Sequence, residues 1–539
     1  MGDAMACTTI LVGRGASYDG STFIARNEDS ANGEFNPKRL VVVKPEQCPR
    51  VYKSVLSHVT VELPDEPLQY TCVPNADLSE GIWGEAGVNE ANVAMSATET
   101  ITSNERVLGA DPLVEFQKSQ GDPEDGVLGY IPETPGGIGE EDFLTLVLPY
   151  IRSAREGVLR LGSLLEKYGT YEMNGVAFSD VNEIWWLETV GGHHWIAKRV
   201  PDESYVVMPN QLGIDEFDLD DAFNAQEEHM CSEDLLEFIE ENHLDLSVES
   251  TSLFNPRDAF GSHSDADHVY NTPRAWYMER FLNPYDEVWD GKDADHRPDS
   301  NDIPWARQPE RKVTVEDIKY VLSSHYQGTE YDPYGKIGDE HTRHLFRPIG
   351  INRQSELSVI QIRPYRPESF RAIQWIAYGS NPFNALVPVY PNVNEIPQYF
   401  EDTTTRVTSE NFYWENRIIA ALADAAFNDT ANAIERYQEL IGSLGHQMIK
   451  TADESVAELE EINLNDFVPE REGDEDYGDL VRDTDAILAS TRNEKVRRAL
   501  AAINNCMSIR VKTETDSLLD NVLYITSMKM KNGFNRSDH

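Results

Sequence analysis

Short apolar runs separated by turn residues fill the first two hundred positions and predict strands. Residues 8–12 and 22–26 flank a region containing Gly13, Gly15 and Gly20, which predicts a hairpin or a tightly connected strand pair. Further β-branched or apolar runs predict strands at 40–43, 58–63 and 92–96. Runs at 175–178, 184–187, 194–197 and 205–208 have the spacing of an antiparallel meander.

Helical periodicity marks two other parts of the chain. Residues 142–168 repeat apolar positions every three or four residues; we expect Pro149 and Gly157 to kink or divide this helix and Gly169 to end it. From about residue 409 onward the pattern is mainly helical, with helices predicted at 412–444, 446–461 and 484–504. Shorter elements are expected between these parts: helices at 273–281 and 313–324, strands at 358–363 and 372–378, and a long loop at 118–140.

Strand runs with segregated helices predict an α+β fold or a layered αββα architecture. No strand is followed by a G-x-G-x-x-G loop and a helix, which disfavours a dinucleotide-binding fold.

Charge narrows the possible partners. The 539 residues contain 46 Lys and Arg against 94 Asp and Glu, a net charge of −48. This balance argues against nucleic acids and anionic membrane surfaces, which require basic patches. No apolar run approaches the roughly 18 residues of a membrane span, and the first residues lack the features of a signal peptide. We therefore expect a cytoplasmic protein, and five widely spaced cysteines predict no disulfide framework.

A thiol and two charged residues stand in the predicted hairpin. Cys7 begins the first strand, and Arg26 and Asp29 lie at the end of the second, which can return to the start of the first. A cation beside a thiol lowers its pKa and makes the thiolate available as a nucleophile. The alternative is a buried structural cysteine and a surface Arg–Asp pair that closes a turn.

Asn89 and Asn210 each lie near the end of a predicted strand. An asparagine amide there can stabilise an oxyanion, although its more common use is to satisfy the backbone of a turn. The pairs His341-x-x-His344 and His193-His194 lack a third ligand with fitting spacing, so we predict no metal and no cofactor.

Taken together, these motifs resemble the dipeptidase A family. These are bacterial cysteine dipeptidases of the N-terminal-nucleophile hydrolase class, related to penicillin V acylase and bile salt hydrolase. The resemblance covers about residues 6–400. It rests on stretches that read ACTTI at 6–10, GSTFIARNED at 20–29, EGIWGEAGVNE at 80–90, YNTPRAW at 270–276, HYQGTEYDP at 325–333, GINR at 350–353 and WIAYG at 375–379.

The resemblance implies a fold and a set of roles. Residues 7–400 would form a four-layer αββα sandwich and residues 401–539 a helical region. Met1 to Ala6 would be a propeptide, removed by autocatalysis so that Cys7 becomes the terminal nucleophile and its α-amine the general base. Arg26 would lie against the thiolate and Asp29 would hold the amine. Asn89 and Asn210 would supply oxyanion donors, and Arg274 resembles a second active-site arginine.

We predict that the substrates are dipeptides and that the specificity for their sequence is broad. Glu28 and Glu85 lie beside the proposed site, and we expect them to pair with the substrate ammonium. An amide acylase acting on a non-peptide substrate, as in the related acylases, is one alternative, and a catalytically silent binding protein on the same fold is another. By similarity to the relatives we also expect a homo-oligomer.

Overall fold

The computed structural model describes residues 6–31, 34–121, 130–248, 253–473 and 478–531. The residues expected to form most of the propeptide therefore lie outside the described part of the chain. The combination of helices with antiparallel sheets makes the fold α+β, as the sequence predicted.

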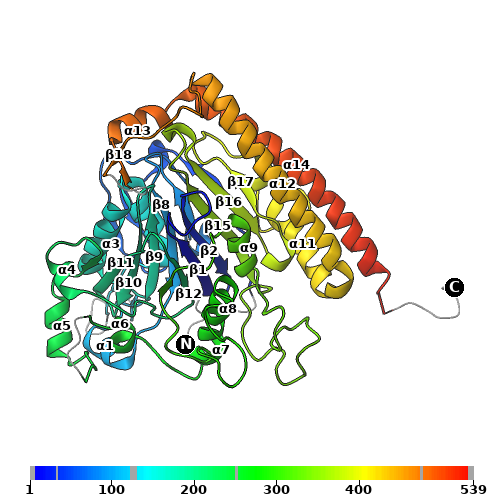
Figure 1. Cartoon of the computed structure of the whole chain (residues 1–539). Coiled ribbons are helices and arrows are strands. Elements are labelled where there is room, and N and C mark those ends of the chain that lie inside the picture. The colour runs from blue at the N-terminus through cyan, green and yellow to red at the C-terminus, as the bar shows by residue number, and fades with distance from the viewer. Residues whose placement is uncertain (1–5, 32–33, 122–129, 249–252, 474–477, 532–539) are drawn as a thin grey trace.

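Two antiparallel sheets carry the fold (Figure 1). The first has seven strands in the order β14 (Ala306–Arg307), β12 (Tyr205–Met208), β1 (Ala6–Val12), β2 (Thr22–Asp29), β15 (Gln354–Ile362), β16 (Ala372–Tyr378) and β17 (Val387–Val389). The second has six: β13 (His229–Cys231), β11 (His194–Arg199), β10 (Ile184–Val190), β9 (Asn174–Ser179), β8 (Ala94–Thr100) and β7 (Ala86–Val88). Two-stranded sheets join β3 (Val41–Val43) to β6 (Tyr70–Cys72), β4 (Val51–Lys53) to β5 (Thr60–Glu62), and β18 (Arg471–Glu472) to β19 (Asp479–Leu480).

The helices vary widely in length. In chain order they are α1 (Glu105–Ala110), α2 (Glu140–Val147), α3 (Ala154–Tyr168), α4 (Leu219–Phe223), α5 (Leu235–Glu241), α6 (Pro256–Phe260), α7 (Asp267–Tyr270), α8 (Thr272–Leu282), α9 (Val315–Val321), α10 (Gln398–Glu401), α11 (Phe412–Asp424), α12 (Phe427–Leu459), α13 (Thr484–Thr491) and α14 (Glu494–Ser527). Helices α12 and α14 pack lengthwise against each other, as Figure 1 shows. None of the helices in the described ranges combines the length and apolarity of a membrane span.

The seven-stranded sheet has an inner face, toward the six-stranded sheet, and an outer face. Successive side chains of a strand alternate between the two. Leu11, Ile24 and Ile360 belong to the core between the sheets. Ile10, Phe23 and Val359 belong to the core of the outer face, where α8, α11 and α12 pack. This alternation decides on which side each functional residue of β1, β2 and β15 lies.

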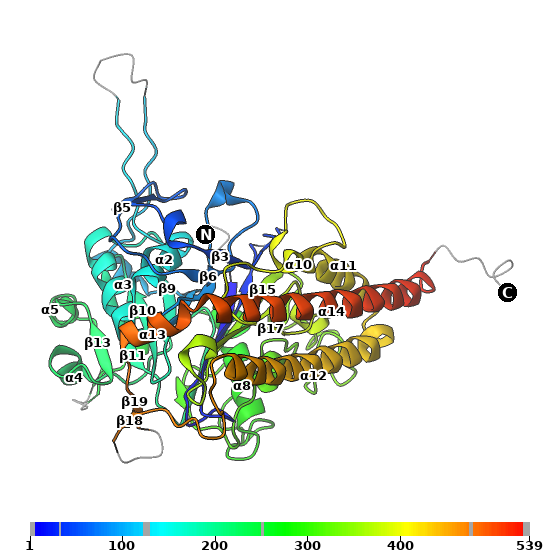
Figure 2. The ribbon, with the colours of Figure 1, turned by 90° about the horizontal axis from the view of Figure 1, so that it is seen from above.

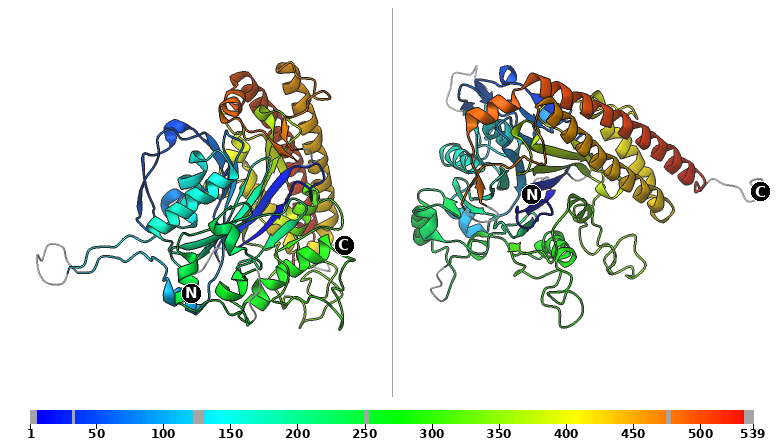
Figure 3. Two further views of the ribbon diagram at one scale, coloured as in Figure 1. Left: turned by 60° about the vertical axis from the view of Figure 1, so that its left-hand side comes forward. Right: turned by 45° about the horizontal axis from the view of Figure 1, so that its top comes forward.

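The structure differs from the sequence prediction at β12, at Gly157 and in the loop at 118–140. Strand β12 does not continue the meander of β9, β10 and β11, because it crosses to the other sheet and pairs with β1. Gly157 does not divide α3: it is buried there, and a Cβ at this position would meet the Phe178 ring. The predicted loop at 118–140 is partly a paired arm, joined by bridges between Gln117 and Thr134 and between Gln120 and Ile131 (Figures 2 and 3).

Candidate active site

Cys7 stands near the start of β1 with its side chain on the inner face, on the same side as Leu11. Its partner in the β1–β2 register is Glu28, and the pair formed by Thr9 and Arg26 lies two residue pairs further along the ladder. The thiol is fully buried. The predicted hairpin therefore forms, with β2 extending three residues further than expected, and it brings Arg26 to the thiol.

Arg26 is the residue that binds the thiol. Its Nη2 donates to Cys7 Sγ at 2.8 Å and to Glu140 Oε1 at 2.7 Å, and its Nη1 donates to Glu85 Oε2 at 2.6 Å. Burial alone would lower the pKa of Arg26, but the negative groups Cys7, Glu85 and Glu140 raise it well above its usual range. A permanent cation beside sulfur stabilises the thiolate, which is the reactive form of cysteine.

Lys38 extends this buried network. Its Nζ donates to Glu85 Oε1 at 2.5 Å and lies 3.8 Å from Glu28 Oε1. Burial would lower the pKa of Lys38, but Glu28 and Glu85 raise it. Glu85 is thus held by two cations at once. This carboxylate, which the sequence analysis predicts to bind substrate, joins Lys38 to Arg26 in the structure.

A different set of charges lies on the outer face. Asp29 faces that side and forms an ion pair with Arg347. Burial would lower the pKa of Arg347, but Asp29 raises it above its usual range. Within the described residues, Asp29 Oδ1 is buried and has no hydrogen-bond partner. Ala6 is the register partner of Asp29, so this carboxyl lies level with the Ala6–Cys7 peptide.

Arg274, at the start of α8, fastens the backbone of Cys7. Its Nη1 donates to the Cys7 carbonyl oxygen and, at 2.7 Å, to Thr8 Oγ1. Its Nη2 donates at 2.7 Å to Asn210 Oδ1 and to Asn271 Oδ1. Arg274 and Asn210 are therefore gathered around Cys7 even though they are far from it in sequence.

Asn89 occupies a turn instead. Its Nδ2 donates at 2.8 Å to the carbonyl oxygens of Leu148 and Ile151, and its Oδ1 accepts from the Ala91 and Val93 amides. This is the turn-satisfying use that the sequence analysis left open. An oxyanion role would require Asn89 to give up these bonds.

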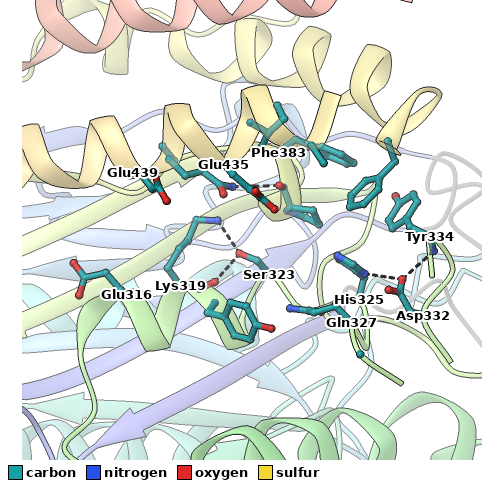
Figure 4. A pocket seen from close by; sticks show the side chains of 18 of the residues that line it. Glu316, Lys319, Ser323, His325, Gln327, Asp332, Tyr334, Phe383, Glu435 and Glu439 are labelled. Atoms are coloured by element: carbon teal, nitrogen blue, oxygen red, sulfur yellow. Dashed lines mark hydrogen bonds and ion pairs between the residues drawn. The ribbon is translucent and has the colours of Figure 1, made fainter. Parts of the chain in front are cut away.

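A cavity of about 850 Å³ lies elsewhere, on the outer side of the seven-stranded sheet (Figure 4). Lys319, His325 and Glu435 line it together with the apolar side chains of Trp375 and Phe383. Because the thiol points to the inner face, this cavity does not serve the chemistry of Cys7.

Sequence reasoning missed four charged residues of the site. They are Lys38, Glu140, Arg347 and Glu356. Lys38 precedes a predicted strand and Glu140 begins a helix, so neither position differs locally from an exposed charge. Only the pairing of distant strands brings Glu356 beside Glu28.

A thiol held by an arginine between two antiparallel sheets, near the start of a strand, defines a cysteine-type hydrolase centre, and the comparisons give the family. Residues 6–440 match Peptidase family C69. A protein named "Dipeptidase" from Bifidobacterium longum (strain NCC 2705) is 72% identical over 99% of this chain and 100% of its own length. "Probable dipeptidase A" from Streptococcus pyogenes serotype M3 (strain SSI-1) is 51% identical over 99% of this chain and its full length.

A more distant relative shows the same pattern. "Dipeptidase A" from Lactobacillus helveticus is 42% identical over 85% of this chain and 90% of its own length. The chain is a cysteine-type peptidase and belongs to Peptidase family C69.

Proposed function

We propose that the chain is a dipeptidase of broad specificity whose nucleophile is Cys7, made N-terminal by autocatalytic removal of residues 1–6. The 2.8 Å contact between Cys7 Sγ and Arg26 Nη2, near the start of a strand, carries this proposal. The packing of helices outside two facing sheets supports its finer fold, a four-layer αββα sandwich of the N-terminal-nucleophile type. The printed names of the relatives support the dipeptide substrate.

In the proposed mechanism the nucleophile and the general base are both groups of Cys7, its thiol and its α-amine. The Cys7 thiol passes its proton to the α-amine, and the resulting thiolate attacks the carbonyl carbon of the dipeptide. The tetrahedral intermediate collapses, the C–N bond breaks, and the amine returns the proton to the departing amino acid. Water, deprotonated by the same amine, hydrolyses the thioester and restores the thiol. An α-amine has a reference pKa of about 7.7–8.0, which suits a base near neutral pH.

The surroundings of β1 fit a new chain end at Cys7. Asp29 Oδ1, buried and without a hydrogen-bond partner among the described residues, is an acceptor for the freed α-amine. Arg274 fixes the Cys7 carbonyl, so the amine of the same residue has little freedom to turn away.

The test combines mass and activity. Intact-mass measurement of the purified protein should show loss of residues 1–6, and a dipeptide panel should be hydrolysed faster than penicillin V or conjugated bile salts. Cys7→Ser should retain the residues and lose at least about 10³-fold in hydrolysis, since it removes the nucleophile.

Cys506→Ser, which changes an exposed cysteine, is the matched control and should process and hydrolyse normally. Preference for the acyl substrates would support the acylase alternative. A chain that keeps its first six residues and hydrolyses nothing would support the silent binding protein.

A further inference from the structure

Three side chains form a row across three neighbouring strands. Cys7 on β1 is the register partner of Glu28 on β2, and Glu28 is the register partner of Glu356 on β15. All three lie on the inner face, because Glu356 alternates in step with Ile360 and Ile362 of the core between the sheets. The thiol therefore has two carboxyl groups beside it, one strand and two strands away.

These two carboxyl groups are buried, and three of their four oxygens have no hydrogen-bond partner among the described residues. Glu28 and Glu356 are both 0% exposed. Among the described residues, neither carboxylate oxygen of Glu28 has a hydrogen-bond partner, and Glu356 uses only Oε2, which accepts from Ser358 at 2.8 Å. Buried polar atoms are almost always hydrogen-bonded, so three such oxygens at one place indicate a donor that the described part of the chain does not supply.

The charges point to the kind of donor. The inner-face cations beside the thiol, Arg26 and Lys38, make their short contacts to Glu85 and Glu140. Lys38 reaches Glu28 only at 3.8 Å, and Glu356 lies among the carboxyl groups of Glu28 and Glu85. Buried carboxylates are stable when a cation pairs with them. The missing donor is therefore a cation rather than a neutral group.

We propose that Glu28 and Glu356 form an ammonium subsite that holds the free α-amino group of the substrate. The inference rests on the proposed dipeptidase function and identifies what would limit it to substrates with a free amino terminus. Glu356 is a specificity residue of this subsite. In this proposal Glu356 takes the place of Glu85 as an ammonium ligand, because the Glu85 carboxylate already binds Arg26 and Lys38.

The spacing of the row fits such a substrate. The α-nitrogen of a dipeptide is two bonds from the carbonyl carbon that the thiolate attacks, and an attacking atom approaches to about 3–3.5 Å. The distance from the nitrogen to the sulfur is therefore comparable with one strand spacing, about 4.7–4.9 Å, and Glu28 is the register partner of Cys7 on the neighbouring strand. Glu356 is the register partner of Glu28 on the next strand and lies on the same face of the sheet.

The amine of Cys7 itself is a competing occupant, but it has its own acceptor. That amine belongs to the backbone beside Ala6, whose register partner is Asp29, and Asp29 carries a buried oxygen without a hydrogen-bond partner among the described residues. Each face of the sheet thus provides one acceptor group: the outer face for the enzyme amine and the inner face for the substrate.

The subsite should respond to pH. Burial raises the pKa of Glu28 to about 7 and that of Glu356 to about 8. An ammonium ion binds to the ionised form, so its binding should release protons near neutrality. KM for dipeptides should therefore rise as the pH falls through this range, because protonation removes the negative charge that the ammonium requires.

The test compares two substrates on processed enzyme. One is a dipeptide such as alanyl-leucine; the other is its des-amino analogue, propionyl-leucine. In Glu28→Gln and Glu356→Gln, KM for the dipeptide should rise about 10- to 100-fold, the loss expected for a charge-assisted hydrogen bond. KM for the analogue should change little, so the preference for the dipeptide should narrow. Glu279→Gln is the control: it removes a buried carboxylate of α8 whose pKa burial raises to about 8, away from the row.

The outcomes separate this inference from the proposed function. Wild-type enzyme that hydrolyses no dipeptide overturns the function. Active wild type with an unchanged substrate ratio in both variants overturns the subsite alone. Equal loss of kcat on both substrates also overturns it, because the carboxylates would then serve the enzyme amine. If the variants fail to fold, calorimetry of the wild type with an amino acid product, in buffers of different ionisation enthalpy, should still show proton release; its absence rejects the subsite.

Discussion

The two faces of the β1–β2 pair at Cys7 differ in the sign of the charge that dominates. On the inner face Glu28, Glu85, Glu140 and Glu356 outnumber Arg26 and Lys38. On the outer face the positive charges of Arg347, Arg353 and Arg274 act on the Asp29 carboxylate. Because a strand exposes alternate side chains to opposite faces, groups on both faces of the sheet can act on the same residue. The inner face acts on the sulfur, and the outer face acts on the backbone of the same residue.

We expect the largest loss of activity from a substitution on the inner face. Arg26→Lys keeps the charge but loses the fork that bonds sulfur and two carboxylates together. We expect kcat/KM to fall about 10²- to 10³-fold near neutral pH, with partial recovery at higher pH as more thiol ionises. A pH profile of kcat/KM on a dipeptide measures this.

Arg363→Lys provides the control for a buried arginine, because Arg363 pairs with Asp453 near the C-terminal helices. If Arg26→Lys and Arg363→Lys lower activity equally, the effect comes from general loss of packing and not from the thiol.

A smaller effect should come from the outer face. Asp29→Asn keeps the shape of the side chain but removes the negative charge that would hold the α-amine. We expect about a 10-fold slower release of residues 1–6 and a similar loss of kcat, with KM nearly unchanged. Time-resolved intact mass and steady-state kinetics give both values. A rise in KM without slower processing would assign Asp29 to the substrate instead.

Asn89 should show the smallest effect on catalysis. Asn89→Ala removes bonds to four backbone groups of the turn, so we expect the free energy of unfolding to fall by about 2 kcal/mol. The kcat of the folded enzyme should stay within about twofold of the wild-type value. Denaturant unfolding measures the free energy of unfolding, and kinetics at low temperature measure kcat. A 100-fold loss of kcat at unchanged stability would restore the oxyanion role.

Local sequence patterns predicted the part of the site that is formed by residues close together in the sequence. The hairpin from Cys7 to Arg26 follows from strand alternation and a turn, and β16 occupies the residues predicted for it. Periodicity also predicted the long helices α11 and α12. The gap between these two helices falls at Ala425 and Ala426, whereas the predicted helices were separated at Gly445.

The rest depends on long-range pairing. Glu356 meets Glu28 only because β15 pairs with β2 across more than three hundred residues. Nothing in the local sequence of β15 distinguishes that pairing from another. The same holds for β12, whose spacing matches the preceding strands but whose partner is β1.

Strand β1 lies between β12 and β2; it pairs with β2 from Ala6 onward and with β12 from Thr9 onward, so Cys7 is held along one edge by β2. Chain termini commonly fray, because nothing restrains them on one side. The chain end that the proposed processing would create at Cys7 is already held by β2 when it forms. Its conformational entropy is lost once, during folding, and need not be lost again in each catalytic cycle.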